Sequence, residues 1–121
     1  MKDFRNLEVW KRAHELVIEV YKITRQFPKE EQYGLTSQMR RSSSSIPTNI
    51  AEGCGRAGDT EFHRFLIIAM GSSSELEYQV LLSHDLGYLK TLQYEDLVQK
   101  IIVARKMLNA LIQKVKPIAN C

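Results

Sequence analysis

The sequence predicts an all-α fold: a single domain over residues 1–121, built as an up-down-up-down antiparallel four-helix bundle that is oligomeric. Three observations predict this fold. The three prolines and six glycines are few, and they gather in short stretches that leave long segments uninterrupted. Apolar residues recur in those segments with the 3.6-residue period of an amphipathic helix. The composition, 44% hydrophobic and 26% charged, excludes a disordered or fibrous chain.

The first helix is expected over residues 6–27, with Asn6 as its N-cap and Pro28 preventing its continuation. Such a helix is roughly 33 Å long at 1.5 Å per residue. Charged side chains share one side, and the opposite side is apolar. The apolar side carries Val9, Trp10, Ala13, Leu16, Val17, Val20, Tyr21, Thr24 and Phe27.

The second helix, residues 35–55, has small or polar side chains at half of its inward positions. The inward stripe is Leu35, Met39, Ser42, Ser43, Ile46, Ile50 and Cys54. Serine is a poor helix former, and Pro47 lacks a backbone N–H. We favour one helix kinked at Pro47. The alternative is that Pro47 ends one helix and that Asn49, with Glu52, starts another through a capping box. The small side chains predict close approach of a neighbouring helix.

The third helix, residues 59–86, follows a glycine-rich turn at 53–58 and is capped by Asp59 or Thr60. A patch of small residues, Ala69 and residues 71–74, is expected to face the serines of the second helix. The inward stripe of the third helix is Phe62, Leu66, Ala69, Ser73, Leu76, Val80, His84 and Gly87.

The fourth helix, residues 93–116, has the most regular apolar seam in the chain, with alternating steps of four and three residues. The seam is Leu97, Ile101, Ala104, Leu108, Leu111 and Val115. Further apolar residues lie outside the stripes of the last two helices, and surface this wide predicts contact with another subunit. These residues are Ile67, Ile68, Leu81, Leu82, Val98, Ile102 and Ile112.

No constellation of catalytic or metal-binding residues is recognisable. The serines lack a GxSxG elbow, and the three histidines form no HExxH motif. The glycines at 53–58 follow a helix and no GK[ST] follows them, which excludes a phosphate loop. The sequence therefore predicts a protein that is not an enzyme and that has no metal and no cofactor.

The cysteines and the termini predict a cytoplasmic protein. Cys54 and Cys121 form neither a metal-binding spacing nor a disulfide framework, and we interpret Cys54 as a small buried apolar residue and Cys121 as a loose terminal thiol. No secretory signal or transit peptide is visible. No apolar stretch nears eighteen residues, so no membrane partner is expected.

The net charge of +3 is too small to identify a polyanionic partner, but its distribution is uneven. Residues 1–27 and 91–121 have basic excesses of two and three, whereas residues 59–90 have an acidic excess of three. On the fourth helix, Lys100, Lys106 and Lys114 share the outer face with only Asp96 near them. These cations form either a solvated face or a surface for nucleic-acid phosphates. The predicted nucleic-acid-binding residues are Lys11, Lys22, Arg25, Lys100, Lys106, Lys114 and Lys116.

Arg105 points among isoleucines on the fourth helix, and a guanidinium in such a place needs a partner. Glu77 is the expected partner and Glu52 the second choice. On the second helix, a polar line that includes Arg41 and Asn49 is either a seam between subunits, which we favour, or a nucleic-acid contact. The predicted structural or interface residues are Arg41, Asn49, Glu52, Glu77 and Arg105.

Several blocks of the chain resemble a known family. They are LEVWKRA (7–13), FPKEEQYGL (27–35), QMRR (38–41), SIPTNIAEG (45–53), FHRFL (62–66), AMGS (69–72) and ELE (75–77), and the spacing of Arg105, Leu108, Leu111 and Ile112 fits as well. These blocks are similar to those of the bacterial four-helix bundle family, also called the 23S ribosomal RNA intervening-sequence proteins. The likeness covers nearly the whole chain.

The resemblance implies a small cytoplasmic protein, often encoded within insertions in 23S ribosomal RNA genes, with no established enzymatic activity. It implies a barrel-like homopentamer with a positively charged surface; five copies would carry about +15. Relatives that are accessory proteins of diversity-generating retroelements bind nucleic acid and a reverse transcriptase. The expected partners are therefore the chain itself, RNA or DNA, and a reverse transcriptase or other protein. The alternative function is a protein-interaction scaffold with no physiological nucleic-acid ligand.

Overall fold

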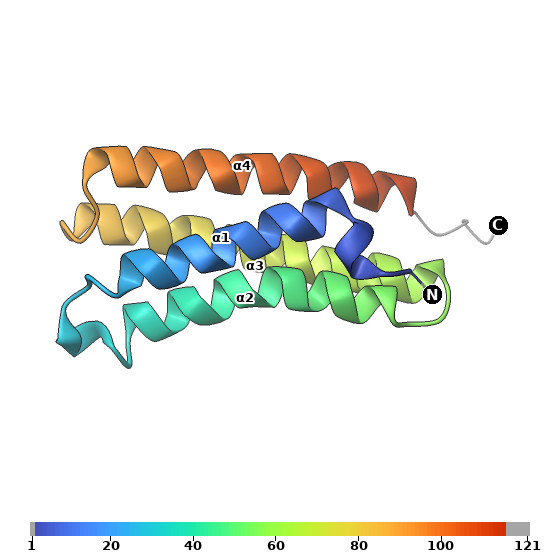
Figure 1. Cartoon of the computed structure of the whole chain (residues 1–121), viewed down its shortest axis with the longest axis horizontal. Coiled ribbons are helices and arrows are strands. Elements are labelled where there is room, and N and C mark those ends of the chain that lie inside the picture. Colours follow the sequence, from blue (N-terminus) through green and yellow to red (C-terminus); the bar gives the residue numbers. More distant parts are fainter. Residues whose placement is uncertain (1, 116–121) are drawn as a thin grey trace.

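Four long helices and two short 3-10 turns make up the fold in this computed structural model, which describes residues 2–115 (Figure 1). The elements are η1 (Phe4–Asn6), α1 (Glu8–Thr24), η2 (Lys29–Glu31), α2 (Leu35–Cys54), α3 (Asp59–Asp85) and α4 (Thr91–Lys114). No strand occurs between residues 2 and 115. The prediction of an all-α chain with four helices is confirmed.

The four helices lie side by side with their long axes in the same general direction (Figure 1). Each helix packs against its neighbour in the sequence, and α1 also packs against α4. The α2–α3 contact is the most extensive. The α1–α2 and α3–α4 connections lie at one end of the molecule, and the α2–α3 connection lies at the other (Figure 1).

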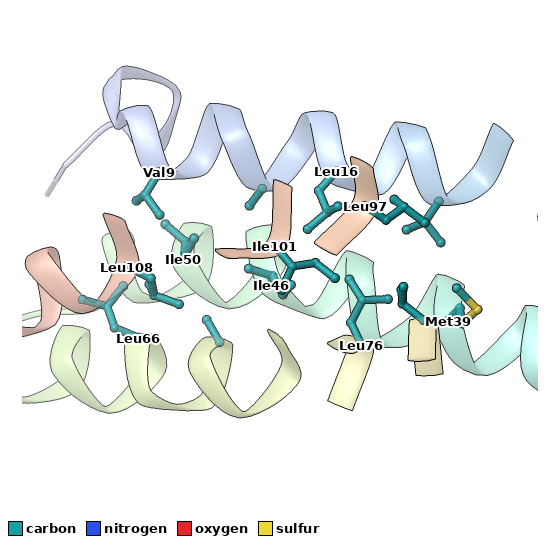
Figure 2. Close-up of a cluster of buried hydrophobic side chains, with 14 of the residues drawn as sticks. Val9, Leu16, Met39, Ile46, Ile50, Leu66, Leu76, Leu97, Ile101 and Leu108 are labelled. Atoms are coloured by element: carbon teal, nitrogen blue, oxygen red, sulfur yellow. The ribbon is translucent and has the colours of Figure 1, made fainter. Parts of the chain in front are cut away.

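The core runs along the space enclosed by the four helices. Figure 2 shows side chains from all four pointing into it, among them Leu16 of α1, Ile46 of α2, Leu76 of α3 and Ile101 of α4. All four are almost completely excluded from solvent. Full burial of one such side chain contributes about 1.5–3 kcal/mol, so the apolar stripes are the main source of stability. Cys54 is buried in this core, as predicted.

The ends of α1 differ from the prediction. Asn6 is not its N-cap, because residues 4–6 form the turn η1, where the side chain of Asp3 accepts the N–H of Arg5 at 3.0 Å. The helix begins at Glu8, after Leu7, which makes no side-chain cap bond. It ends at Thr24, since the N–H groups of Gln26 and Phe27 bond to carbonyls only three residues back.

The small residues of α2 and α3 do face each other. The hydroxyl of Ser42 donates to Oε1 of buried Gln79 at 2.6 Å, and Oγ of Ser45 lies 2.8 Å from Oγ of Ser72. The helix α2 is continuous through Pro47, so the alternative of two helices is wrong. Proline at this position removes one backbone hydrogen bond, but it does not end the helix.

Several predictions for α3 and α4, on their ends and on their inward residues, are corrected by the structure. The N-cap of α3 is Gly58, whose φ of +85° suits glycine, so Asp59 and Thr60 lie inside the helix. His84 is only half-buried, stacked on the ring of Tyr94 with centroids 4.3 Å apart, and Gly87 is exposed at the end of α3. In α4, which begins at Thr91, Ile112 is buried where the seam predicted Leu111. Residue 116, the predicted end of this helix, lies outside the described residues.

Candidate nucleic-acid interface

The three predicted cations of the first helix do not have the same surroundings. Nζ of Lys11 lies 3.2 Å from Oε1 of Glu8, so a carboxylate of the same helix already compensates its charge. Lys22 in α1 and Arg25 just after it are exposed and form no ion pair with any residue in the described range 2–115. Only the latter two remain fully available to an anionic partner.

Lys100 is the most strongly engaged cation of α4. Its ammonium lies 2.8 Å from Oδ2 of Asp96 and 3.9 Å from Oε2 of Glu19 on α1. The expectation that only Asp96 lies near the lysines was therefore wrong, because the sequence did not place Glu19 beside them. The hydrogen bond with Asp96, and then the charge of Glu19, raise the pKa of Lys100. Its ammonium is therefore compensated by carboxylates on both α4 and α1.

Lys106 and Lys114 are exposed on the outside of α4. Neither forms an ion pair with a described residue. Together with Lys22 and Arg25 they are the predicted nucleic-acid-binding residues whose charges are uncompensated. Lys116 lies outside the described residues.

The predicted pairing of Arg105 is confirmed: its guanidinium donates to Oε1 of Glu77, joining α4 to α3. Both side chains are partly exposed, at 34% and 44%, so this ion pair lies at the surface and the guanidinium is not buried. The carboxylate of Glu52, the second choice, instead lies 3.5 Å from the guanidinium of Arg56, which follows the end of α2. Asn49 donates from Nδ2 to the carbonyl oxygen of Ser45 at 2.7 Å, and Arg41 is exposed.

The structure also identifies cations that the site prediction missed. Arg12, Lys29, Arg40 and Lys90 form no ion pair with the residues that are described, and neither does Arg41, which was assigned to an interface. Arg40 and Arg41 are adjacent on α2 and both line one open pocket. The sequence shows both arginines in the QMRR block, but only the tertiary arrangement shows that they have no carboxylate partner.

Helix α3, in contrast, carries an excess of negative charge. Residues 59–85 contain five carboxylates and a single arginine, Arg64. Nε of Arg64 donates to Oε2 of Glu61 at 3.0 Å, and this hydrogen bond lowers the pKa of Glu61. The uncompensated cations therefore lie on α1, α2, α4 and the connecting segments, while α3 is acidic.

Neither a metal centre nor a membrane span is found in the described part of the chain. No group of three or more His, Cys, Asp or Glu side chains there could hold a metal ion. Over the same residues, no helix is both long enough and apolar enough to cross a bilayer.

Four packed helices, with uncompensated cations on three of them and an excess of carboxylates on α3, define a small all-α protein with an asymmetric charge distribution. A family model described as 23S rRNA-intervening sequence protein matches residues 5–110, and the chain belongs to that family. A crystal structure of a protein of unknown function from the S23 ribosomal protein family of Bacteroides thetaiotaomicron has a similar fold, with a TM-score of 0.80 at 24% identity. The similarity covers 87% of this chain and 95% of that one. No curated protein matches the chain.

Proposed function

We propose that this chain is a non-enzymatic, cytoplasmic helical bundle that assembles with copies of itself and binds structured RNA or DNA through the basic faces of α1 and α4. The observation that supports binding most directly is the set of exposed, uncompensated cations on these elements, including Lys22, Arg25, Lys106 and Lys114. A lysine without a carboxylate neighbour can neutralise a phosphate and release its counterions. A lysine already in an ion pair gains less.

An up-down-up-down order of the helices is part of this proposal. It is supported by the short connections and by their alternation between the two ends of the molecule (Figure 1). In this order α1 and α4 are neighbours, which agrees with the contact of Lys100 with Glu19. The basic residues of these two helices would then share one side of the bundle.

Assembly into a homo-oligomer, a pentamer in our proposal, is supported by a stripe on the outside of α3. The stripe consists of Ile67, Gly71, Ser74, Tyr78 and Leu81, spaced four, three, four and three residues apart, and all five are exposed. Such spacing places them on one helix face, as in a helix–helix seam. The stripe lies on the acidic helix, so contact there would leave the basic helices free and would add their charges together.

Nucleic-acid binding is tested by fluorescence anisotropy with labelled RNA, DNA and hybrid duplexes at about 50 mM salt. We expect binding whose affinity falls steeply as salt is added. The double variant Lys106→Gln/Lys114→Gln removes two uncompensated charges. We expect it to reduce the slope of log affinity against log salt by about 0.9 for each phosphate that is no longer neutralised.

The matched control is Lys11→Gln/Lys100→Gln, which changes the net charge equally but removes two ion-paired lysines. We expect it to weaken binding less than the first variant. Equal losses would mean that net charge alone matters and that the uncompensated residues form no interface. Absence of binding to all three duplexes would overturn the proposed function.

Assembly is tested by light scattering at micromolar concentrations, where we expect about five times the chain mass of 14.0 kDa. Ile67→Glu/Leu81→Glu should reduce the mass towards that of one chain. Leu92→Glu, at an exposed site outside the stripe, should not. A wild-type mass near 14.0 kDa throughout would overturn the assembly.

The stripe also favours a second function, a scaffold that binds a partner protein and for which nucleic acid is incidental. The Lys106→Gln/Lys114→Gln variant separates the two functions. If it retains full biological activity although its nucleic-acid affinity is weakened, the scaffold is the better account.

A further inference from the structure

An open pocket of about 390 Å³ lies where the C-terminal part of α1 meets the N-terminal half of α2. Tyr21 of α1, Tyr33 of the connecting segment and Arg40 and Arg41 of α2 line it, together with polar side chains that include Ser37. Its volume is within the range of small-ligand pockets, about 300–1,000 Å³. No residue that lines the pocket is an aspartate or a glutamate.

Arg40 is held in a defined position by neutral groups. Its guanidinium lies over the ring of Tyr21, 4.6 Å from the centroid. Nε donates to the hydroxyl of Thr24 at 3.0 Å, and Nη2 donates to the carbonyl oxygen of Tyr21 at 3.4 Å. These acceptors orient the guanidinium but do not neutralise it. A half-buried, pre-oriented cation without a counter-ion is suited to bind an anion.

The carboxylate of Glu31, in the segment that connects α1 to α2, is already engaged. Its Oε1 accepts the backbone N–H of Leu35 at 3.1 Å, and its Oε2 accepts the hydroxyl of Tyr88 at 2.8 Å. Both carboxylate oxygens of Glu31 thus accept hydrogen bonds from other groups, and Glu31 does not line the pocket. By contrast, Arg56, Arg64 and Arg105 elsewhere in the chain each have a carboxylate partner.

Tyr33 supplies the second feature of the pocket. Its side chain is 91% exposed, the largest exposed fraction among the large apolar side chains described. An aromatic ring in water beside two guanidinium groups is the arrangement with which proteins bind unpaired nucleotides. The ring can stack on a base, and the arginines and a serine hydroxyl can bind the adjoining phosphate.

The geometry points to a binding site for an unpaired nucleotide of an RNA or DNA strand, with its phosphate at Arg40 and Arg41 and its base stacked on Tyr33. This inference rests on the proposed nucleic-acid binding and adds to it a place and a preference for unpaired bases. The nucleotide site differs from the basic faces of α1 and α4, which would contact the phosphates of paired and unpaired strands alike. It also assigns to Arg41 the nucleic-acid contact that the sequence left open.

The test uses the full-length protein, a fluorescein-labelled 12-nucleotide oligouridine, and an RNA duplex of the same length, with anisotropy as the readout. Tyr33→Ala should weaken binding of the single strand by about 5- to 150-fold, the usual loss for one stacked base, and should leave the affinity for the duplex within about twofold. Tyr33→Trp preserves the stacking surface and should retain the affinity. Because Tyr33 is exposed, we expect none of these changes to affect folding, which thermal unfolding checks.

Arg41→Gln tests the phosphate contact. We expect it to lower the affinity for the single strand and to reduce the salt slope by about 0.7. Arg64→Gln changes the net charge equally on α3, where Arg64 is paired with Glu61, and should leave single-strand binding within about twofold. A 4-thiouridine-labelled strand should photo-cross-link to the tryptic peptide of residues 30–40, which contains Tyr33.

The outcomes separate this inference from the proposed function. If the wild-type protein binds no duplex, the proposed function fails, and if it binds no single strand, this site fails. If it binds the duplex while Tyr33→Ala leaves single-strand affinity unchanged, the function stands and the nucleotide site is overturned. Equal losses for strand and duplex would also overturn it, because the site would then not distinguish unpaired bases.

Discussion

Gly53 of α2 lies so close to Phe62 of α3 that a β-carbon on the glycine would stand 2.9 Å from Cδ1 of the phenylalanine ring. It would also lie 3.0 Å from Cβ of Phe65. Both aromatic side chains are buried, so neither can move aside without disturbing the core. Gly53 lies within the helix α2 and its φ is not positive. Glycine is therefore needed at this position for the close approach of the two helices and not for a special backbone conformation.

Gly53→Ala is therefore expected to lower the free energy of unfolding by about 1–3 kcal/mol, the usual cost of overpacking a core. The higher helix propensity of alanine offsets part of this loss, about 0.5–1 kcal/mol. Urea unfolding followed by circular dichroism measures the change.

Gly55→Ala is the control, because Gly55 has a negative φ of −84° and the nearest contact of a β-carbon there would be the carbonyl oxygen of Glu52 at 3.6 Å, an ordinary van der Waals distance. This variant should raise the free energy of unfolding by about 0.5–1 kcal/mol. If both glycine variants stabilised the protein, the tight contact with Phe62 would be refuted.

The ion pair between Arg105 and Glu77 should contribute little to stability. With 34% and 44% of these side chains exposed, solvent screens the interaction. A double-mutant cycle with Arg105→Ala and Glu77→Ala should give a coupling free energy of about 0.2–1 kcal/mol, which decreases as salt is added. A coupling several times larger and insensitive to salt would mean that the pair is buried in an interface between subunits.

Cys54 should be nearly inert in the folded protein. Burial raises the pKa of its thiol, which lowers the thiolate fraction, and its side chain is almost inaccessible. In a Cys121→Ser background, a thiol reagent such as DTNB should react with Cys54 only after denaturant unfolds the chain. Fast reaction under native conditions would contradict the placement of Cys54 in the core.

Tyr88 should link stability to pH in the alkaline range. Its hydroxyl donates to Glu31 at 2.8 Å, and this hydrogen bond, with the burial and the negative charge around it, raises the pKa of Tyr88. The stabilising contribution is therefore complete below the unfolded pKa of about 10 and is lost as pH rises through the folded pKa. Stability measured from pH 8 to 11 should fall more steeply in the wild type than in Tyr88→Phe.

A spectroscopic titration checks the same group directly. The tyrosinate absorbance of the wild type minus that of Tyr88→Phe should titrate above pH 10. Glu31→Gln should move this difference towards lower pH because it removes the negative charge. A difference curve with its midpoint below 10 would contradict the hydrogen bond.

Much of the fold was readable from the sequence because an amphipathic helix repeats its pattern over many turns. The four helices and the buried positions of Leu97, Ile101 and Leu108 follow from a period that no single residue can obscure. The helix ends were less predictable, because one local hydrogen bond decides them. Asn6 was a suitable N-cap by residue type, yet the bond from Arg5 to Asp3 placed it in a 3-10 turn instead.

The arrangement of charged residues was likewise predictable only in part from the sequence. The sequence by itself determined the excess of basic residues at both ends and the acidic third helix, and helical spacing made Glu77 the first of two candidate partners of Arg105. Only the tertiary structure decided which cations are compensated. Glu19 reaches Lys100 from another helix, while Arg40 and Arg41 lie beside Tyr33 with no carboxylate in their pocket. An ion pair depends on distances of a few ångströms between separate helices, and that geometry exists only after the helices have packed.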